Sequence, residues 1–265
     1  MQLLELCREM EIEVAVPENE ARKSALPEDG RLAAVVPRLE DEQVDFCVAM
    51  GGDGTILRAL NRFRDMATPV LGINFGRMGF LSAFGPGDIS RQLRPVLAGE
   101  FTLLDLCLLR MRLGEESRLA FNDVVVHKPD GGSVIRLAYS VGDVEMDSFQ
   151  CDGLVAATPA GSTAYNLSNG GPLASLALEA FILSAIAPHT LHSRPLVLAA
   201  GERVRIINRS MSAEASLFLD GRAEGSLPPG GEVEISLSGR KAHLVQAAGA
   251  DFFQTLRQKF IRPQK

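Results

Sequence analysis

The stretch that decides the fold is Val44-Asp45-Phe46-Cys47-Val48-Ala49-Met50, followed directly by Gly51-Gly52-Asp53-Gly54-Thr55. A near-continuous apolar run of this length is typical of a parallel strand that is buried on both faces. The glycines then break the strand, and residues 55–64 have the pattern of a helix. Residues 69–73 predict another buried strand and residues 88–98 another helix, so the first lobe is predicted to be α/β with a mainly parallel sheet.

The chain before this stretch is less regular. Residues 1–16 predict a helix that leads into a short strand. Residues 17–39 are polar and contain Pro17, Pro27, Gly30 and Pro37, which favours a mobile connection. A strand usually precedes the first helix of an α/β lobe, and we expect that strand to be missing here.

The pattern changes near residue 103, where helical periods give way to short β-branched or alternating runs. These predict a mostly antiparallel, β-rich second lobe, and residues 251–261 predict a helix that returns to the first lobe. The expected domains are residues 1–102, 103–245 and the helical segment 246–265. The expected strands of the second lobe are 104–113, 119–127, 134–141, 154–157, 194–198, 204–208 and 232–237.

Composition excludes several classes of protein. The formal net charge of -6 argues against nucleic acid as a partner, because binding a phosphate backbone normally needs a clustered basic surface. No apolar run reaches the roughly 20 residues that cross a bilayer, so no membrane association is expected. The four cysteines form no close pair, which indicates reduced thiols, three of them as core hydrophobes, in a cytoplasmic protein.

The glycine-rich turn carries the first chemical signal. Gly51, Gly52 and Gly54 lack side chains, so backbone N–H groups are open to a phosphate, and Thr55 is suited to cap the helix or bind a phosphate oxygen. The turn has neither the Walker pattern nor the Gly-x-Gly-x-x-Gly fingerprint. Asp53 is either an ordinary turn residue or a carboxylate that takes a proton or holds Mg²⁺.

The second signal is Asp152-Gly153 followed by Thr158-Pro159-Ala160-Gly161-Ser162-Thr163-Ala164-Tyr165-Asn166-Leu167-Ser168. Proline, glycine and two hydroxyl residues should end a strand and start a short helix with free N–H groups. Tyr165 suits an adenine ring, and Asp152 suits ribose hydroxyls or a carboxamide. A core tyrosine and a capping aspartate are the structural alternatives.

Together these residues support a family assignment. Gly51-Gly52-Asp53-Gly54-Thr55 resembles the turn shared by NAD kinases, diacylglycerol and sphingosine kinases and, more distantly, phosphofructokinases. The segment from Asp152 to Ser168 resembles NAD kinases alone, and Asn122-Asp123 is similar to their Asn-Glu/Asp pair. Weaker likenesses lie at residues 188–195 and 219–221, so the resemblance covers residues 44 to 245.

The resemblance implies transfer of the terminal phosphate of ATP or polyphosphate to the 2′-hydroxyl of the adenosine ribose of NAD, which gives NADP. Asp53 would be the general base, and the donor would bring Mg²⁺ or Mn²⁺, because no dedicated metal motif is present. The residues implied to bind NAD are Gly54, Phe75, Asn122, Asp123, Asp152, Thr163, Ala164, Tyr165 and Ser168, and those for phosphate are Gly51, Gly52 and Thr55. Relatives usually form homodimers or homotetramers through the β lobe, and the active site is expected between the lobes.

Further candidates for the site are Arg77, Arg136, His189, Asp220 and Arg222. For the arginines a solvated surface position is the default, and His189 with His192 lacks the pattern of a zinc site. Two other functions stay open at this point. A lipid or small-alcohol kinase shares the first motif, and a non-catalytic dinucleotide sensor would fit the missing strand and the departures from the family pattern at Gln150 and Ala160.

Overall fold

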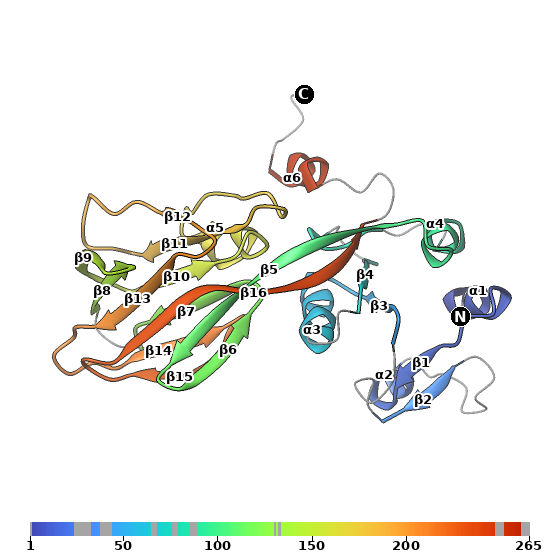
Figure 1. Cartoon of the computed structure of the whole chain (residues 1–265), viewed down its shortest axis with the longest axis horizontal. Helices are drawn as coiled ribbons and strands as arrows, with labels where there is room; N and C mark the ends of the chain where they lie inside the picture. Colours follow the sequence, from blue (N-terminus) through green and yellow to red (C-terminus); the bar gives the residue numbers. More distant parts are fainter. Residues whose placement is uncertain are drawn as a thin grey trace. The chain divides into compact units, whose positions relative to one another are not determined.

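The computed structural model describes residues 2–23, 33–37, 44–64, 68–75, 79–84, 89–129, 131, 134–246 and 252–260. The chain forms two compact units, Met1–Leu104 with His243–Lys265 (unit 1) and Asp105–Ala242 (unit 2). Figure 1 labels their elements. In unit 1 these are α1 (Gln2–Glu9), β1 (Ala15–Pro17), α2 (Glu18–Lys23), β2 (Ala34–Val36), β3 (Cys47–Met50), α3 (Asp53–Phe63), β4 (Val70–Ile73), α4 (Ile89–Leu97) and α6 (Phe252–Phe260).

The remaining elements start at the end of unit 1 or lie in unit 2. They are β5 (Thr102–Leu113), β6 (Glu116–Ala120), β7 (Asp123–His127), β8 (Ile135–Val141), β9 (Val144–Cys151), β10 (Gly153–Ala157), the 3₁₀ turn η2 (Gly161–Thr163), α5 (Tyr165–Ser168), β11 (Ala180–Ile186), β12 (Leu196–Ala199), β13 (Arg203–Asn208), β14 (Ala215–Leu219), β15 (Arg222–Leu227) and β16 (Glu232–Gln246).

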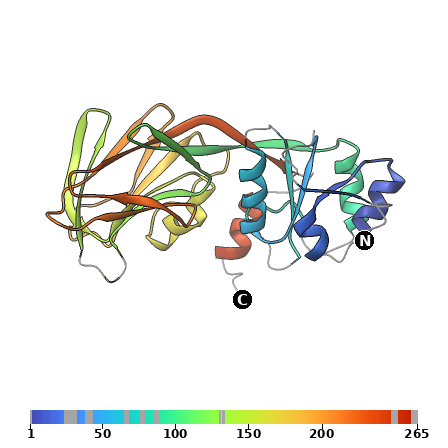
Figure 2. The same ribbon diagram turned by 90° about the horizontal axis from the view of Figure 1, so that it is seen from below.

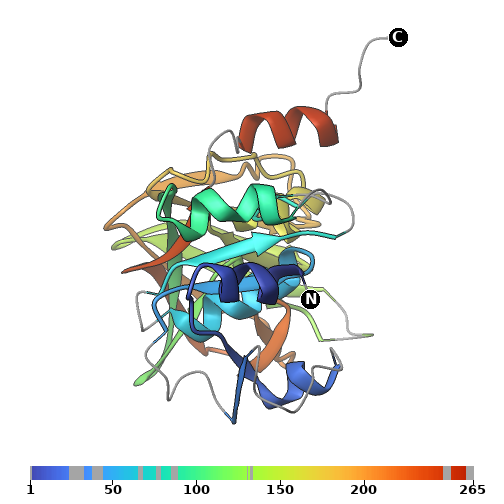
Figure 3. The same ribbon diagram turned by 90° about the vertical axis from the view of Figure 1, so that its right-hand side faces the viewer.

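Unit 1 is built on the parallel strands β3 and β4, which the apolar run before Gly51 predicts. Val48 pairs with Leu71, and Leu244 at the end of β16 adds a further parallel neighbour to β4. Figures 2 and 3 show α3 on one side of β3 and β4, with α1 and α4 side by side on the other. Gly72 lets α3 pack closely, because a Cβ there would lie 2.4 Å from Cδ1 of Ile56.

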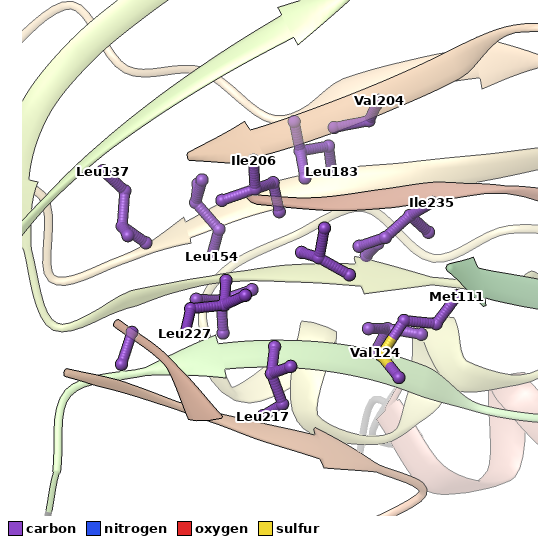
Figure 4. Close-up of a cluster of buried hydrophobic side chains, with 14 of the residues drawn as sticks. Met111, Val124, Leu137, Leu154, Leu183, Val204, Ile206, Leu217, Leu227 and Ile235 are labelled. Carbon is purple, nitrogen blue, oxygen red and sulfur yellow. The ribbon is translucent and has the colours of Figure 1, made fainter. Parts of the chain in front are cut away.

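Unit 2 consists of antiparallel strands in two sheets. One has the order β12-β11-β10-β7-β14-β15, and in the other β16, β13, β8 and β9 are neighbours. Alternate side chains of both sheets point into a single core, as Figure 4 shows. From the first sheet, that core includes Val124, Leu154, Leu183 and Leu217. From the second sheet and from β5, which pairs with β16, it includes Met111, Leu137, Val204, Ile206 and Ile235.

The C-terminal helix α6 packs within unit 1. Rings of its Phe252 and Phe260 lie 5.8 and 6.0 Å from the ring of Phe80. The fold class predicted from the sequence is therefore confirmed, with a parallel α/β lobe, an antiparallel β-rich lobe and a C-terminal helix that returns to the first lobe.

Two local predictions were wrong. Within the connection expected at residues 17–39, residues 18–23 form α2 and residues 34–36 form β2, whereas residues 24–32 and 38–39 lie outside the described residues. Helix α2 has polar pairs, such as Arg22 to Glu18 at 2.6 Å, rather than an apolar face. The single strand expected at residues 119–127 is interrupted between β6 and β7 at residues 121–122. Backbone N–H groups of the interrupted segment bind a side chain instead of a neighbouring strand.

The cysteines agree with their expected role. Cys7, Cys107 and Cys151 are buried and Cys47 is half-buried, and all four are free thiols. Burial raises the pKa of Cys47 and Cys151 to about 12, so both thiols stay protonated and pack as small hydrophobes. None of the helices in the described parts of the chain is long and apolar enough to span a membrane.

Candidate active site

In unit 1, the glycine-rich turn exposes backbone at the N-terminus of α3. Gly51 closes the end of β3 through its N–H, which donates to the carbonyl of Ile73 at 2.8 Å. A Cβ at Gly51 would lie 2.6 Å from Oγ1 of Thr55, whereas Cβ atoms at Gly52 and Gly54 would meet nothing within 4 Å. Gly51 is therefore required for packing, and Gly52 and Gly54 leave the helix N-terminus open to an anion.

Thr55 has a cationic neighbour that the sequence pattern did not reveal. Its hydroxyl does not cap α3, since the N-cap residue is Gly52 and no side-chain cap bond forms. Instead, Oγ1 of Thr55 accepts a hydrogen bond of 3.0 Å from the guanidinium of Arg58, which is exposed. The spacing of three residues on one helix face is the signal that could have found Arg58.

Asp53, the first residue of α3, is held by a turn far away in the sequence. Its Oδ2 accepts the backbone N–H of Phe80 at 2.8 Å, and its Oδ1 accepts that of Leu81 at 3.2 Å. The carboxylate lies against Gly79, where a Cβ would be 1.8 Å from Oδ1. Asp53 is thus half-buried, fixed in orientation and still in contact with solvent.

Two other residues of unit 1 were candidates. Phe75 follows β4 and is 54% exposed, so its ring is available to a ligand. Arg77 lies outside the described residues.

In unit 2, the two segments singled out from the sequence are joined by hydrogen bonds. Thr158 donates its hydroxyl to the carbonyl of Phe121 and its N–H to the carbonyl of Asn122, the latter at 2.8 Å. Gly161 packs so closely that a Cβ would lie 2.0 Å from the carbonyl oxygen of Asn122. Residues 121–123 and 158–161 are therefore packed and hydrogen-bonded together. The short helix predicted after Pro159 is present as η2 and α5.

Asn166 organises this helix from inside, a role the sequence did not suggest. Its side chain is fully buried, donates to the carbonyl of Pro172 at 3.0 Å and accepts the hydroxyl of Ser184 at 2.8 Å. Gly171 leaves no space for a side chain, since a Cβ there would lie 2.0 Å from Oδ1 of Asn166. The small polar residues of the run thus serve internal structure as well as any ligand.

Asp220 holds the Asn122-Asp123 segment. Its carboxylate accepts the backbone N–H groups of Phe121, Asn122 and Asp123 at 3.0, 2.6 and 3.3 Å, and its own N–H donates to the carbonyl of Asp123. Asp220 has φ +48°, a left-handed conformation that aspartate tolerates better than most residues. Its position fits a residue that orients its neighbours.

Asp123 is an unusual carboxyl group. It is 4% exposed, and burial, followed by the nearby charge of Asp220, raises its pKa from 3.8 to about 7 despite a hydrogen bond from the backbone of Tyr165. Burial and the charges of Asp152 and Asp123 also raise the pKa of Tyr165. These shifts place Asp123, Asp152 and Tyr165 in one electrostatic neighbourhood.

Lys128 balances part of this negative charge. Its ammonium lies 2.9 Å from a carboxylate oxygen of Asp152, and its N–H donates to the carbonyl of Asp152 at 2.8 Å. Both side chains are about one quarter exposed, so the ion pair is partly buried but still in contact with solvent. The two residues are 24 positions apart, and only the pairing of β7 with β10 makes them neighbours.

Comparison with known proteins decides the family. The model of the ATP-NAD kinase N-terminal domain matches residues 5–101, and that of the C-terminal domain matches residues 121–247. The chain belongs to the NAD kinase family. NAD kinases of Symbiobacterium thermophilum and Carboxydothermus hydrogenoformans are 36% and 35% identical to it over 82% of this chain, and the matches cover 78% and 80% of those proteins.

Solved structures agree with this assignment. An NAD kinase from Archaeoglobus fulgidus in complex with ATP superposes with a TM-score of 0.71 at 32% identity, covering 93% of this chain and 98% of that one. Yeast NADH kinase in complex with NADH has the same fold, with a TM-score of 0.87 at 23% identity over 100% of this chain and 84% of that one.

The other residues implied by the NAD kinase resemblance have the following positions. Thr163 is half-buried and donates its hydroxyl to the carbonyl of Ala160, Ala164 is half-buried, and Ser168 and Tyr165 are exposed. Arg136, His189 and Arg222 are all exposed. The guanidinium of Arg136 donates to the carbonyl of Ser148, and the backbone N–H of His189 to that of Gln150. Among the described residues, no three His, Cys, Asp or Glu side chains are grouped so as to hold a metal ion.

Proposed function

We propose that the protein is an NAD kinase that transfers the terminal phosphate of ATP to the 2′-hydroxyl of the adenosine ribose of NAD, which yields NADP and ADP. The proposal is supported by two local arrangements, one in each unit. Asp53 is fixed at an open helix N-terminus in unit 1, and Asn122, Asp123, Asp152 and Tyr165 belong to one hydrogen-bonded and electrostatic neighbourhood in unit 2.

Unit 2 would bind NAD. Asn122 and Asp123 accept hydrogen bonds from ribose hydroxyls, and Tyr165 with Ala164 lines the adenine site. Asp152, Thr163 and Ser168 position the nicotinamide half, with Lys128 fixing the carboxylate of Asp152 at 2.9 Å. The contact of Asp220 with residues 121–123 makes it a positioning residue, because its carboxylate is committed to backbone N–H groups.

Unit 1 would carry out the transfer. Asp53 takes the proton of the 2′-hydroxyl, whose oxygen attacks the terminal phosphorus while the bond to the bridging oxygen of ADP breaks. A carboxylate offers about four acceptor sites, so the two N–H groups of Phe80 and Leu81 leave room for the hydroxyl.

The donor would lie at the glycine-rich turn. The N–H group of Gly52, the hydroxyl of Thr55 and the guanidinium of Arg58 can bind its phosphates, while Gly51, whose N–H donates to the carbonyl of Ile73, shapes the turn. Gly54 and the exposed ring of Phe75 would complete the contact with NAD. We propose ATP rather than polyphosphate as the donor, because the related NAD kinase from Archaeoglobus fulgidus was solved in complex with ATP.

Phosphoryl transfer of this kind uses Mg²⁺ or Mn²⁺, which neutralises charge on the donor. The residues of the glycine-rich turn fit a cation whose ligands come mainly from the donor phosphates rather than from protein side chains. Asp53 is the one carboxylate in residues 51–55, and both of its oxygens already accept backbone N–H groups. The protein would therefore supply few metal ligands.

A homodimer or homotetramer is also proposed. Strand β12 is at the edge of its sheet with Val197 57% exposed, and β9 is at the edge of the other with Val144 63% and Met146 48% exposed. Apolar edge strands favour contact with another copy. Light scattering after size-exclusion chromatography would measure the mass of the oligomer.

A cytoplasmic location is proposed as well, and the four free thiols support it.

The decisive experiment compares wild type with Asp53→Asn, which keeps the size of the side chain and removes the base. We expect kcat for NADP formation to fall by about 10³-fold or more while the Kd for NAD changes less than about twofold. Asp143→Asn, in the exposed turn between β8 and β9, is the matched control and should retain full activity. Equal turnover by Asp53→Asn and wild type would refute the mechanism.

The lipid-kinase alternative finds no support, because the match to NAD kinases extends beyond residues 51–55 to residues 121–247, which include most of unit 2. A non-catalytic sensor would bind NAD without turnover, so the same assay tests it. Arg136, His189 and Arg222 remain candidates for phosphate contacts, which single alanine variants would reveal through the KM for NAD or ATP.

A further inference from the structure

Phe80 links the proposed base to the C-terminal helix. Its backbone N–H donates to Oδ2 of Asp53 at 2.8 Å, and Leu81 donates to Oδ1 at 3.2 Å. The position of the carboxylate therefore depends on how residues 79–81 are held. Gly79 lets the turn lie close to the carboxylate, since a Cβ there would be 1.8 Å from Oδ1 of Asp53.

Helix α6 packs on the ring of Phe80 from several directions. The ring of Phe260 stacks on it at 6.0 Å with an interplanar angle of 14°, and the ring of Phe252 approaches at 5.8 Å and 48°. Nζ of Lys259 lies 4.1 Å from the centroid of the same ring, within the range of a cation–π interaction. Phe252 and Lys259 are seven residues apart and so share one face of the helix.

Helix α6 makes these contacts without burying a side chain in the core of unit 1. No side chain of α6 is buried, and Phe260 remains 46% exposed. The helix therefore contributes little to the apolar interior of unit 1, and its aromatic and cationic contacts converge on the residue that donates to Asp53.

We infer that α6 is a positioning element for catalysis, in which Phe252, Lys259 and Phe260 fix Phe80 and, through its N–H, orient the carboxylate of Asp53. This inference rests on the proposed function, in which Asp53 is the base. Loosening the aromatic contacts should let residues 79–81 move, so the carboxylate loses the orientation needed to meet the 2′-hydroxyl. Binding of NAD, which the residues of unit 2 carry out, should be affected little.

The test uses the full chain with both Phe252 and Phe260 changed to Leu. Phe253→Leu is the matched control, because Phe253 is on the same helix with its ring 61% exposed and packs against Phe252. We expect the double variant to lose about 10- to 100-fold in kcat, the range for a catalytic group displaced by up to about 1 Å, with the KM for NAD within twofold of wild type. Phe260→Tyr, which keeps the ring, should restore activity relative to Phe260→Leu.

A double-mutant cycle separates positioning from general damage. In an Asp53→Asn background the Leu substitutions should cause almost no further loss of kcat, because the base they orient is already absent. A further loss as large as in wild type would overturn the inference, as would unchanged kcat in the double variant. If that variant does not fold, the single Phe260→Leu variant carries the same test with an expected loss of about threefold, since one of the two rings remains. Inactive wild type would instead refute the proposed function itself.

Discussion

Asp123 gives the most quantitative prediction. Its pKa is raised from 3.8 to about 7 by burial and by Asp220, so between these values the folded protein holds a proton that the unfolded chain has lost. The folded state then binds more protons than the unfolded state, and the free energy of unfolding falls as pH rises through this interval. Above pH 7 the carboxylate is charged in both states, and the folded protein carries the full cost of burying it.

Asp123→Asn removes the titration and keeps the shape of the side chain. Each pH unit between 5 and 7 is worth about 1.4 kcal/mol, so wild type should lose on the order of 2–3 kcal/mol relative to Asp123→Asn between pH 5 and pH 8. Urea unfolding of both proteins at the two pH values measures this difference. Asp143→Asn, which replaces an exposed aspartate, should change in stability between pH 5 and pH 8 by the same amount as wild type. If wild type kept the same stability relative to Asp123→Asn at both pH values, or gained stability relative to it as the pH rises, Asp123 would not be held neutral.

Three further substitutions test the local geometry. Gly79→Ala places a Cβ 1.8 Å from Oδ1 of Asp53 and should reduce kcat by about 100-fold with NAD binding intact, as measured by steady-state kinetics and calorimetry. Asp220→Ala leaves three backbone N–H groups without their acceptor, so the Kd for NAD should rise about tenfold, and an unchanged Kd would exclude a positioning role. Asn166→Ala leaves the buried hydroxyl of Ser184 without its acceptor and should lower the free energy of unfolding by about 1–3 kcal/mol, which thermal or urea unfolding would detect.

Local features of this fold could be predicted from the sequence. The apolar run at residues 44–50 predicts a buried strand, which is observed as β3 (Cys47–Met50), and the helix expected from residue 55 is observed as α3, which begins two residues earlier at Asp53. The short helix after Pro159 was likewise predictable, because proline and the hydroxyl residues that follow it act locally. In each case the determining interactions lie within a few residues of one another.

The contacts that complete the site could not be predicted in this way. Asp53 is bound by N–H groups 27 and 28 residues away, and Asp220 binds residues 97 to 99 positions before it. Nothing in the local pattern at Asp220 distinguishes it from an ordinary turn aspartate. The raised pKa of Asp123 likewise depends on burial by strands that are distant in the sequence.

The distribution of charge explains why two motifs are needed. In unit 2, the carboxylate of Asp152 is paired with the ammonium of Lys128, and burial and Asp220 keep Asp123 protonated below about pH 7. In the proposed function this cluster offers hydrogen-bond partners to ribose hydroxyls and a carboxamide rather than a cationic site for the phosphates of a donor. In unit 1, open N–H groups and Arg58 suit those phosphates, and the charge of Asp53 is moderated by two hydrogen bonds. A glycine-rich turn alone would thus bind a donor without choosing an acceptor. In the proposed function, Asp123 and Asp152 make that choice, because they favour a substrate that presents hydroxyl donors.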